Sequence, residues 1–256
     1  MSGSRTFYVG IDIGSVSANT VVLDEHRNML EEHYTRTKGE PLETSLSILS
    51  EIIHKYGKEN IKLVAATGSG GKLIAPLIGA AFTNEVIAQA KATEVFHPEA
   101  RTIIEMGGQD AKLIFMAPDG DDGKLRIADF QMNSVCAAGT GSFLDQQAFR
   151  MGLTIEAFGH LALKSEHPPR VAGRCSVFAK SDMIHLQQIA TPDYDIVAGL
   201  CYAVARNFKA TIGKGKEFVK PVAFQGGVAA NQGVRKAFKE VLELDEANYI
   251  IPAHFA

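Results

Sequence analysis

The chain has 256 residues, of which 46% are hydrophobic and 21% are charged, so a chain of this size needs neither a disulfide nor a metal to stabilise its core. Its formal net charge is −3 at pH 7, and acidic and basic residues are interspersed without a basic stripe, which argues against a nucleic-acid partner. No apolar run reaches the roughly 18 residues that span a bilayer, and the polar start does not resemble a signal peptide, so we expect a cytoplasmic protein without a membrane partner, whose three cysteines are reduced thiols or metal ligands.

The first part of the chain is predicted to form an antiparallel meander, a helix, a buried strand and a second helix. Runs of apolar, β-branched and aromatic residues indicate the strands, and apolar residues at helical spacing indicate the helices. Asn84 precedes the second helix as a candidate N-cap, and a glycine-rich turn from Thr67 to Gly71 closes the buried strand. The predicted strands cover residues 7–13, 17–24, 28–38 and 61–66, and the predicted helices cover 42–56 and 84–96.

The order of elements then begins again, with a strand, a glycine pair and two further strands. Helices dominate afterwards, before a last clear strand that leads through glycines into a helix. This recurrence indicates an internal duplication, and we expect a first domain over residues 1–95 and a second over 96–256. The predicted strands of the second part cover residues 101–106, 111–116, 124–131, 222–225 and 249–251, and the predicted helices cover 141–151, 176–189, 193–212 and 231–242.

An acidic residue and a glycine stand at the end of the first predicted strand. Gly14 allows the backbone to come close to a phosphate, and the carboxylate of Asp12 can hold Mg²⁺ through water. Ser15, Ser17 and Thr20 add hydroxyl groups that can donate to phosphate oxygens. The alternative interpretation is an ordinary hairpin turn without a ligand.

Two further predicted strands end in a glycine pair beside polar residues. The last of them leads into a helix N-terminus, which is favourable for the phosphate or ribose of a nucleotide. Neither the dinucleotide-binding fingerprint nor the Walker A motif is present in the chain. The candidate residues are Glu105, Gly107, Gly108, Gln109 and Asp110 after one strand and Gln225, Gly226, Gly227 and Asn231 after the other.

Three glycine-rich strand ends in this order resemble the two phosphate loops and the adenosine loop of the actin, Hsp70 and sugar kinase superfamily. The resemblance implies an α/β protein with the two-domain, duplicated RNase H-like fold of that superfamily. It also implies that the β- and γ-phosphates of ATP lie between the first two loops and that the domains close over them.

Two cysteines, Cys136 and Cys175, stand among small residues just before predicted helices. A helix N-terminus favours the thiolate form and hence metal ligation. A [4Fe–4S] cluster takes four thiolates, a number that a twofold dimer of this chain would supply. The alternative is that both cysteines are small buried residues, which is the interpretation that we give to Cys201 within an apolar helix.

Five motifs together resemble one family: V-G-I-D-I-G-S, E-M-G-G-Q-D, N-S-V-C-A-A-G-T-G-S-F-L, G-R-C-S-V-F-A-K-S-D and Q-G-G-V-A-A-N. From about residue 8 to residue 256 the chain is similar to the activators of 2-hydroxyacyl-CoA dehydratases, a family that includes the ATPase subunits of benzoyl-CoA reductases. The resemblance implies a homodimer in which Cys136 and Cys175 of each protomer bind one shared [4Fe–4S] cluster. ATP hydrolysis would then drive a low-potential electron from a ferredoxin- or flavodoxin-like donor into a dehydratase or reductase partner.

The resemblance also implies roles for the loop residues. Asp12, Gly14 and Ser15 would bind phosphate and Mg²⁺, Gln109 would lie near the attacking water, and Asp110 would help to orient that water. Chains of this family continue past the equivalent of residues 250–254 with a helix rich in glycine and alanine, whereas this chain stops at residue 256. We therefore expect a piece of a longer polypeptide whose C-terminal helix is missing.

Two other functions are compatible with the same loops. A small-molecule kinase of this fold would need a catalytic aspartate that faces a sugar pocket, and it would leave Cys136 and Cys175 unexplained. A regulatory module would hold ATP without appreciable hydrolysis, even in the presence of its partner.

Overall fold

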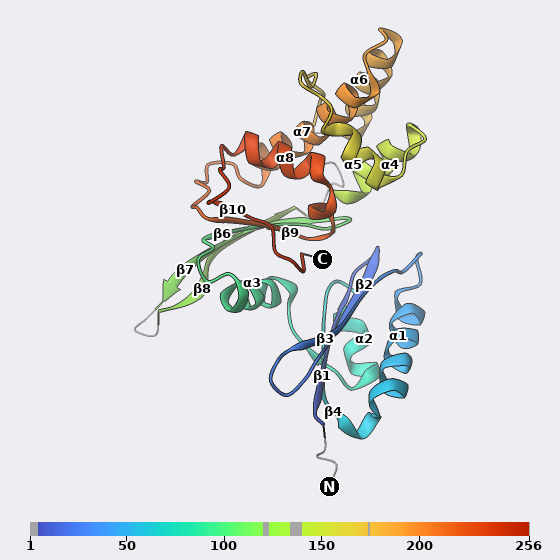
Figure 1. The fold of residues 1–256 in the computed structure, drawn as a ribbon, viewed down its shortest axis with the longest axis vertical. Coiled ribbons are helices and arrows are strands. Elements are labelled where there is room, and N and C mark those ends of the chain that lie inside the picture. The colour runs from blue at the N-terminus through green and yellow to red at the C-terminus, as the bar shows by residue number, and fades with distance from the viewer. Residues whose placement is uncertain (1–4, 120–122, 134–139, 174, 256) are drawn as a thin grey trace. The chain divides into compact units, whose positions relative to one another are not determined.

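The computed structural model describes residues 5–119, 123–133, 140–173 and 175–255 (Figure 1). The chain divides into two compact units between Ala92 and Thr93. This division lies inside helix α3 (Glu85–Phe96), near whose end the sequence predicts the domain boundary. Val86 N donates to Asn84 Oδ1 over 2.9 Å, so Asn84 caps α3 as expected.

The first unit contains one five-stranded sheet in the order β3-β2-β1-β4-β5. The first three strands form the antiparallel meander that the sequence predicts, and β4 and β5 extend the sheet in parallel with β1. The elements are β1 (Phe7–Ile13), β2 (Ser17–Leu23), β3 (Met29–Arg36), α1 (Pro41–Tyr56), η1 (Lys58–Asn60), β4 (Ile61–Thr67), α2 (Gly71–Ile78) and β5 (Ala81–Phe82).

Side chains alternate between buried and less buried positions along β1, which shows which face of this sheet packs against the core. Phe7, Val9, Ile11 and Ile13 are buried together with apolar residues of α1 and α2. Asp12 points to the opposite face, because successive residues of a strand alternate between the two faces. The core therefore holds the strand in place while its polar residue stays outside the core.

The second unit repeats this topology with a sheet in the order β8-β7-β6-β9-β10. An antiparallel meander again precedes two parallel strands, so the duplication expected from the sequence is present in the fold. The elements are β6 (Thr102–Met106), β7 (Ala111–Asp119), β8 (Lys124–Asn133), α4 (Gly141–Arg150), α5 (Ile155–Ala162), α6 (Ser176–Gln188), α7 (Asp193–Thr211), β9 (Val222–Gln225), η2 (Gly227–Ala230), α8 (Gln232–Val241) and β10 (Tyr249–Ile250).

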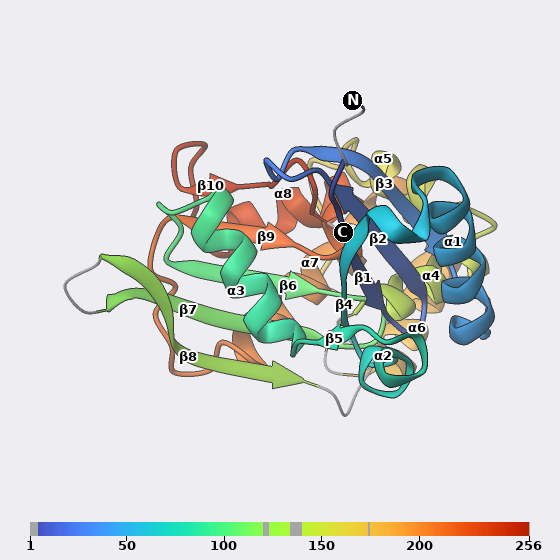
Figure 2. The same cartoon turned by 90° about the horizontal axis from the view of Figure 1, so that it is seen from below.

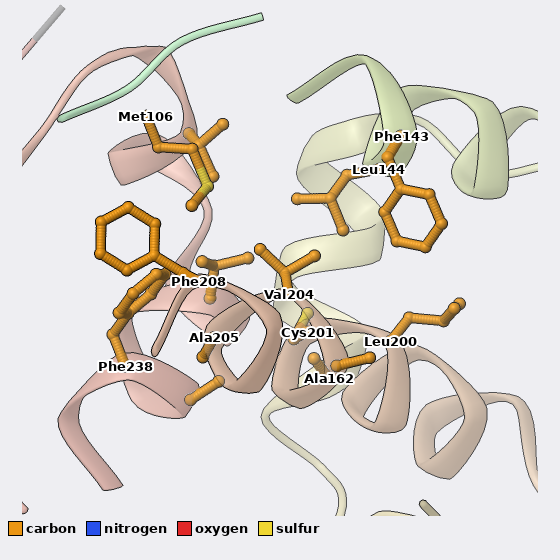
Figure 3. Close-up of a cluster of buried hydrophobic side chains, with 14 of the residues drawn as sticks. Met106, Phe143, Leu144, Ala162, Leu200, Cys201, Val204, Ala205, Phe208 and Phe238 are labelled. Atoms are coloured by element: carbon orange, nitrogen blue, oxygen red, sulfur yellow. The ribbon is translucent and has the colours of Figure 1, made fainter. Parts of the chain in front are cut away.

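Helix α7 is the centre of the second core (Figure 3). Its Leu200, Cys201, Val204 and Phe208 are almost fully buried, and Phe208 meets the ring of Phe238 from α8 at 5.4 Å between centroids. Figures 1 and 2 show α7 and α8 on the same face of the sheet that contains β6 and β9. This packed layer supports the carboxyl ends of β6 and β9, where two of the glycine-rich loops begin.

Two helices were not predicted, and glycine or proline residues explain both omissions. Helix α2 begins with glycines and contains Pro76, which lowers helix propensity. Helix α5 contains Gly159, whose missing side chain is needed because a Cβ there would lie 2.9 Å from Asn231 Oδ1. In the described part of the chain, no helix is both long and apolar enough to cross a membrane.

Candidate functional site

The first loop is a tight connection between β1 and β2. Gly14 N donates to Ser17 O over 2.9 Å, and Thr37 Oγ1 fixes the turn by donating to Ser15 O over 2.9 Å. A Cβ on Gly14 would lie 3.1 Å from Ser17 O, so the turn has little room for a side chain at this position. Ser15 is exposed at the tip. The turn is therefore fixed by these hydrogen bonds while its tip is exposed.

Asp12 lies in a row of three polar side chains. Its strand neighbours are Asn19 in β2 and Thr67 in β4, and directly opposed residues point to the same face of a sheet. Asn19 Oδ1 and Thr67 Oγ1 are both buried and have no hydrogen-bond partner among the described residues. Two buried polar atoms without partners beside a carboxylate indicate that a polar ligand or ordered water belongs there.

The turn after β4 closes over the end of β1. Gly70 N donates to Ile13 O over 2.8 Å, and Gly68 adopts φ of +85°. A Cβ on Gly68 would collide with Asp12 Oδ1 and would lie 2.6 Å from Ile13 O, so only glycine fits. The sequence prediction did not assign this turn, Asn19 or Thr67 to the site. The sequence signal for this turn is the cluster of glycines that follows a buried strand. Parallel pairing of that strand, β4, with β1 brings the glycines close to Asp12.

Thr20 lies apart from the other candidates of the first loop. It pairs with Ile11, is 1% exposed, and faces the core, whereas Ser17 and Asn19 are on the face of Asp12. Its Oγ1 has no hydrogen-bond partner in the described residues. The structure therefore brings Asp12, Gly14 and Ser17 to one end of the sheet and does not bring the Thr20 hydroxyl there.

The second loop joins β6 to β7 and contains a buried ion cluster. Gly107 N donates to Asp110 O over 3.0 Å, which closes the turn. Lys112 Nζ lies 2.8 Å from Glu105 Oε2 and 2.9 Å from Asp110 Oδ2. Gln109 is exposed at the tip of the turn. Lys112 was not a sequence candidate, although a single lysine within the apolar run of β7 was a visible signal.

The third loop lies directly beside the second. Glu105 and Gln225 are neighbours in the parallel β6–β9 pair, so both strands end at the same edge of the sheet. Gly226 adopts φ of +89°, and a Cβ there would lie 2.5 Å from Met106 O and 2.8 Å from Glu105 Oε1. Only glycine allows the two loops to approach this closely.

Asn231 has a structural role in the third loop. Its Oδ1 accepts from Val234 N over 3.1 Å and so caps α8. Its Nδ2 is buried without a hydrogen-bond partner in the described part of the protein. Gly227, which follows β9 in the same loop, has open space where a Cβ would lie.

The described cysteines have different environments. Cys175 is half-buried at the N-cap of α6, and Asp182 Oδ2 accepts from Ala172 N over 2.8 Å, which joins the segment before Cys175 to the helix after it. Cys201 is fully buried, and burial raises the pKa of its thiol to about 12, as expected for a core residue. Cys136 lies outside the described residues. Within the residues that are described, no three His, Cys, Asp or Glu side chains gather as metal ligands.

The second loop is joined to the start of α4. Gly141 N donates to Gly107 O over 2.9 Å, and Ser142 N donates to Gly108 O over 2.8 Å. A Cβ on Gly141 would lie 3.1 Å from Val228 Cγ2 and 3.2 Å from Gly107 O, so the contact is tight. Two of the N–H groups that a helix start leaves free are thus bound by the carbonyls of the loop.

The sequence of this chain matches a known protein family and several of its members. The model of the BadF/BadG/BcrA/BcrD ATPase family matches residues 9–255. The 2-hydroxyisocaproyl-CoA dehydratase activator of Clostridioides difficile is 32% identical over 234 residues, which are 90% of this chain and 84% of the relative. The (R)-2-hydroxyglutaryl-CoA dehydratase activating ATPase of Acidaminococcus fermentans is 31% identical over 245 residues, which are 93% of this chain and 89% of the relative.

A solved structure shows the same fold. It is the activator of the 2-hydroxyisocaproyl-CoA dehydratase from Clostridium difficile with bound ADPNP, and it matches with a TM-score of 0.83 and 29% identity. The match covers 98% of this chain and 90% of that chain. The two-domain actin, Hsp70 and sugar-kinase-like fold expected from the three loops is therefore confirmed.

Proposed function

Because the chain belongs to the BadF/BadG/BcrA/BcrD ATPase family, we propose that it hydrolyses ATP to drive a low-potential electron into a 2-hydroxyacyl-CoA dehydratase or benzoyl-CoA-reductase-like partner. The electron would come from a ferredoxin- or flavodoxin-like donor, and an iron–sulfur cluster held by Cys136 and Cys175 of two copies of the chain would serve as the one-electron carrier. Two relatives at 31% and 32% identity, an activating ATPase and an activator of such dehydratases, support this proposal.

The first loop has the residues that Mg·ATP needs. Mg²⁺ keeps several of its waters and prefers carboxylate ligands, so Asp12 would hold the ion through water. Asn19 Oδ1 and Thr67 Oγ1, which are buried without partners in the described protein, could accept hydrogen bonds from such waters. Gly14, Ser15 and Ser17 face the phosphates.

The second and third loops supply further candidate residues for the nucleotide. The backbone of Gly107 and Gly108 binds phosphate, Gln109 positions the attacking water, and Asp110 orients it. On the nucleoside side are Gln225, Gly226, Gly227 and Asn231, where the open space at Gly227 allows a close approach. The first loop belongs to the first unit, and the second and third loops belong to the second unit.

The cluster is assigned to Cys136 and Cys175 of two protomers, and when bound it supplies a one-electron carrier. Cys175 fits this role because it lies at the N-cap of α6 and is only half-buried, so its thiol is accessible to a ligand. Cys201 does not fit, since burial disfavours its thiolate.

The observation that carries the proposal is the pair of hydrogen bonds from Gly141 and Ser142 to the second loop. Helix α4 begins at Gly141, five residues after Cys136 in the sequence. The proposed phosphate-binding loop is therefore tied by backbone hydrogen bonds to a helix start that lies close in sequence to a proposed cluster ligand. A shift of Gly107 and Gly108 on phosphate binding would move the start of α4 directly, without any intervening side chain.

The experiment uses anaerobically purified protein and two matched variants. The wild type should contain iron, form a dimer, hydrolyse ATP and activate a dehydratase component. Cys175→Ala should lower both the iron content and the dimer fraction, while Cys201→Ala should change neither. Iron-free protein with full ATP turnover, or a monomer with a full cluster, would contradict the proposal. Phosphate transfer to an amino sugar instead of water would point to a kinase.

A further inference from the structure

Lys112 is a buried lysine with two carboxylates. Its side chain is 3% exposed, that of Glu105 is 9% exposed, and that of Asp110 is 32% exposed. Lys112 and Glu105 are opposed residues of the antiparallel β6–β7 pair, so the cluster is built on two strands of the sheet rather than on flexible segments. Two carboxylates and one ammonium group leave it with one net negative charge.

A buried ion cluster is weak evidence for a stabilising role. Burying an ammonium group costs free energy that its partners have to offset, and apolar residues of similar volume are often as stable. The surrounding positions of β6 and β7 are apolar and fully buried, including Ile104 and Leu113. A charged cluster at this one position, where β6 and β7 meet the glycine turn, therefore points to a role in the turn.

The contacts of the two carboxylates show what that role is. Asp110 belongs to the turn itself, where its backbone carbonyl accepts from Gly107 N and a Cβ on Gly107 would lie 3.0 Å from its Oδ1. Glu105 has Lys112 at Oε2, while its Oε1 lies beside Gly226 of the third loop. Lys112 thus holds the side chains that border both loops of the second unit.

We propose that Lys112 is a positioning residue for Mg·ATP: its ammonium group fixes the Asp110 carboxylate at the second loop and the Glu105 carboxylate between the second and third loops. It provides a cation that belongs to the protein, so the two carboxylates stay in place before nucleotide and Mg²⁺ arrive. An ammonium group with three donors can hold both acids at once through Glu105 Oε2 and Asp110 Oδ2, while Asp110 Oδ1 lies beside Gly107 of the second loop. This inference rests on the ATP-binding part of the proposed function only.

The test compares three variants that separate charge from position. Lys112→Met removes the cation and makes the cluster more negative, and Glu105→Gln makes it neutral. The double variant Glu105→Gln/Lys112→Met has the same net charge as the wild type and no unpaired buried ion, so we expect it to fold even if Lys112→Met does not. Lys216→Met is the matched control, because Lys216 also pairs with an aspartate, Asp129 at 2.6 Å, on an exposed part of the same unit.

The measurements are the affinity for ADP and for a non-hydrolysable ATP analogue by calorimetry, each with and without Mg²⁺, and the Mg²⁺ concentration that half-saturates hydrolysis. Loss of a residue that orients a metal-facing group typically costs about 10–100-fold in metal affinity or activity, so we expect a loss of that size in the double variant. The loss should appear in the Mg²⁺-dependent part of the affinity, and Lys216→Met should match the wild type.

Wild-type Mg²⁺ dependence in the folded double variant would overturn the inference and leave Lys112 as a structural residue. A wild type that binds no nucleotide would instead contradict the proposed function, so the two failures are distinguishable. Iron content, measured on the same preparations, should be equal in the wild type and the double variant.

Discussion

At the scale of single residues, three polar side chains form a row across β2, β1 and β4. Asp12 lies between Asn19 and Thr67, and the two neighbours have buried oxygens without partners in the described residues. A carboxylate flanked in this way suits a hydrated cation better than an ordinary hairpin turn does. The first loop alone could not establish this from sequence, because Thr67 is far from Asp12 along the chain.

Asp12→Asn should lower Mg·ATP turnover by about 10–100-fold, because it removes the charge that holds the ion and leaves the shape of the side chain. Thr67→Val should raise the Mg²⁺ concentration needed for half-maximal turnover, while Asn19 and Asp12 stay in place. Steady-state hydrolysis over a Mg²⁺ titration, with thermal melts to establish folding, checks both. Turnover of Asp12→Asn equal to that of the wild type would show that the first loop is wrongly assigned.

A second residue-scale prediction concerns pH and stability. Hydrogen bonds from Lys55, Tyr56 and His33 lower the pKa of Glu31 from 4.5 to about 2, with the Lys55 contribution the largest. A carboxyl group whose pKa is lower in the folded state stabilises the fold above its unfolded pKa. This contribution is present above about pH 4.5 and is lost as the pH falls toward 2.

Glu31→Gln should therefore lower the free energy of unfolding at pH 7 by about 1 kcal/mol or less, since Lys55 is exposed and solvent screens the pair. The difference from the wild type should shrink as the pH falls from 5 to about 2.5. Urea unfolding across this range measures it, with the exposed Glu51→Gln on the same unit as control. A difference that grows toward low pH would contradict this account.

At the scale of elements, the sequence predicts the strands and helices that carry the loops, because apolar periodicity is a local property. The duplication was also predictable, since both halves repeat the same order of elements. Helices α2 and α5 were missed because Pro76 and Gly159 oppose helix formation locally. Tertiary packing outweighs that tendency, since α2 packs against the sheet and Gly159 of α5 lies against Asn231.

The missed site residues have a similar cause. Lys112, Asn19 and Thr67 acquire their partners from neighbouring strands, and strand register is a tertiary property that one sequence does not reveal. Thr20 was assigned by its hydroxyl alone, but alternation along β2 turns it toward the core. The environment of Cys136 and the roles of the loop residues stay predictions.

An element-scale prediction concerns the start of α4. Gly141→Ala would place a methyl group 3.2 Å from Gly107 O and 3.1 Å from Val228 Cγ2, so these neighbours or the helix start would have to shift by a few tenths of an ångström. Overpacking of this kind typically costs about 1–3 kcal/mol of stability. We expect that hydrolysis persists while nucleotide loses its influence on the cluster, because the two backbone hydrogen bonds weaken.

The matched control for Gly141→Ala is Ser142→Ala, which keeps the backbone N–H that donates to Gly108 O. It should behave like the wild type in hydrolysis and in nucleotide-dependent iron release. If Gly141→Ala also behaves like the wild type in both assays, the start of α4 does not transmit the state of the second loop.

At the scale of the whole molecule, we propose that ATP acts on the cluster that Cys136 and Cys175 would hold. Each unit has its own sheet and its own loop or loops, and the second unit also contains Cys136 and Cys175. Phosphate contacts can therefore favour one arrangement of the protein over another, and a ligand shifts an equilibrium only by its difference in affinity for the two states. ATP and ADP should differ in their effect, since only ATP has the γ-phosphate.

The most direct test is the rate at which a chelator removes iron from the anaerobic dimer, together with the midpoint potential of the cluster, in ADP, in ATP and in a non-hydrolysable analogue. We expect faster iron release in ATP and in its analogue than in ADP. We also expect the midpoint potential of the cluster in ATP and in its analogue to differ from that in ADP. Equal rates and equal midpoints in all three states, in protein with a full cluster, would contradict it.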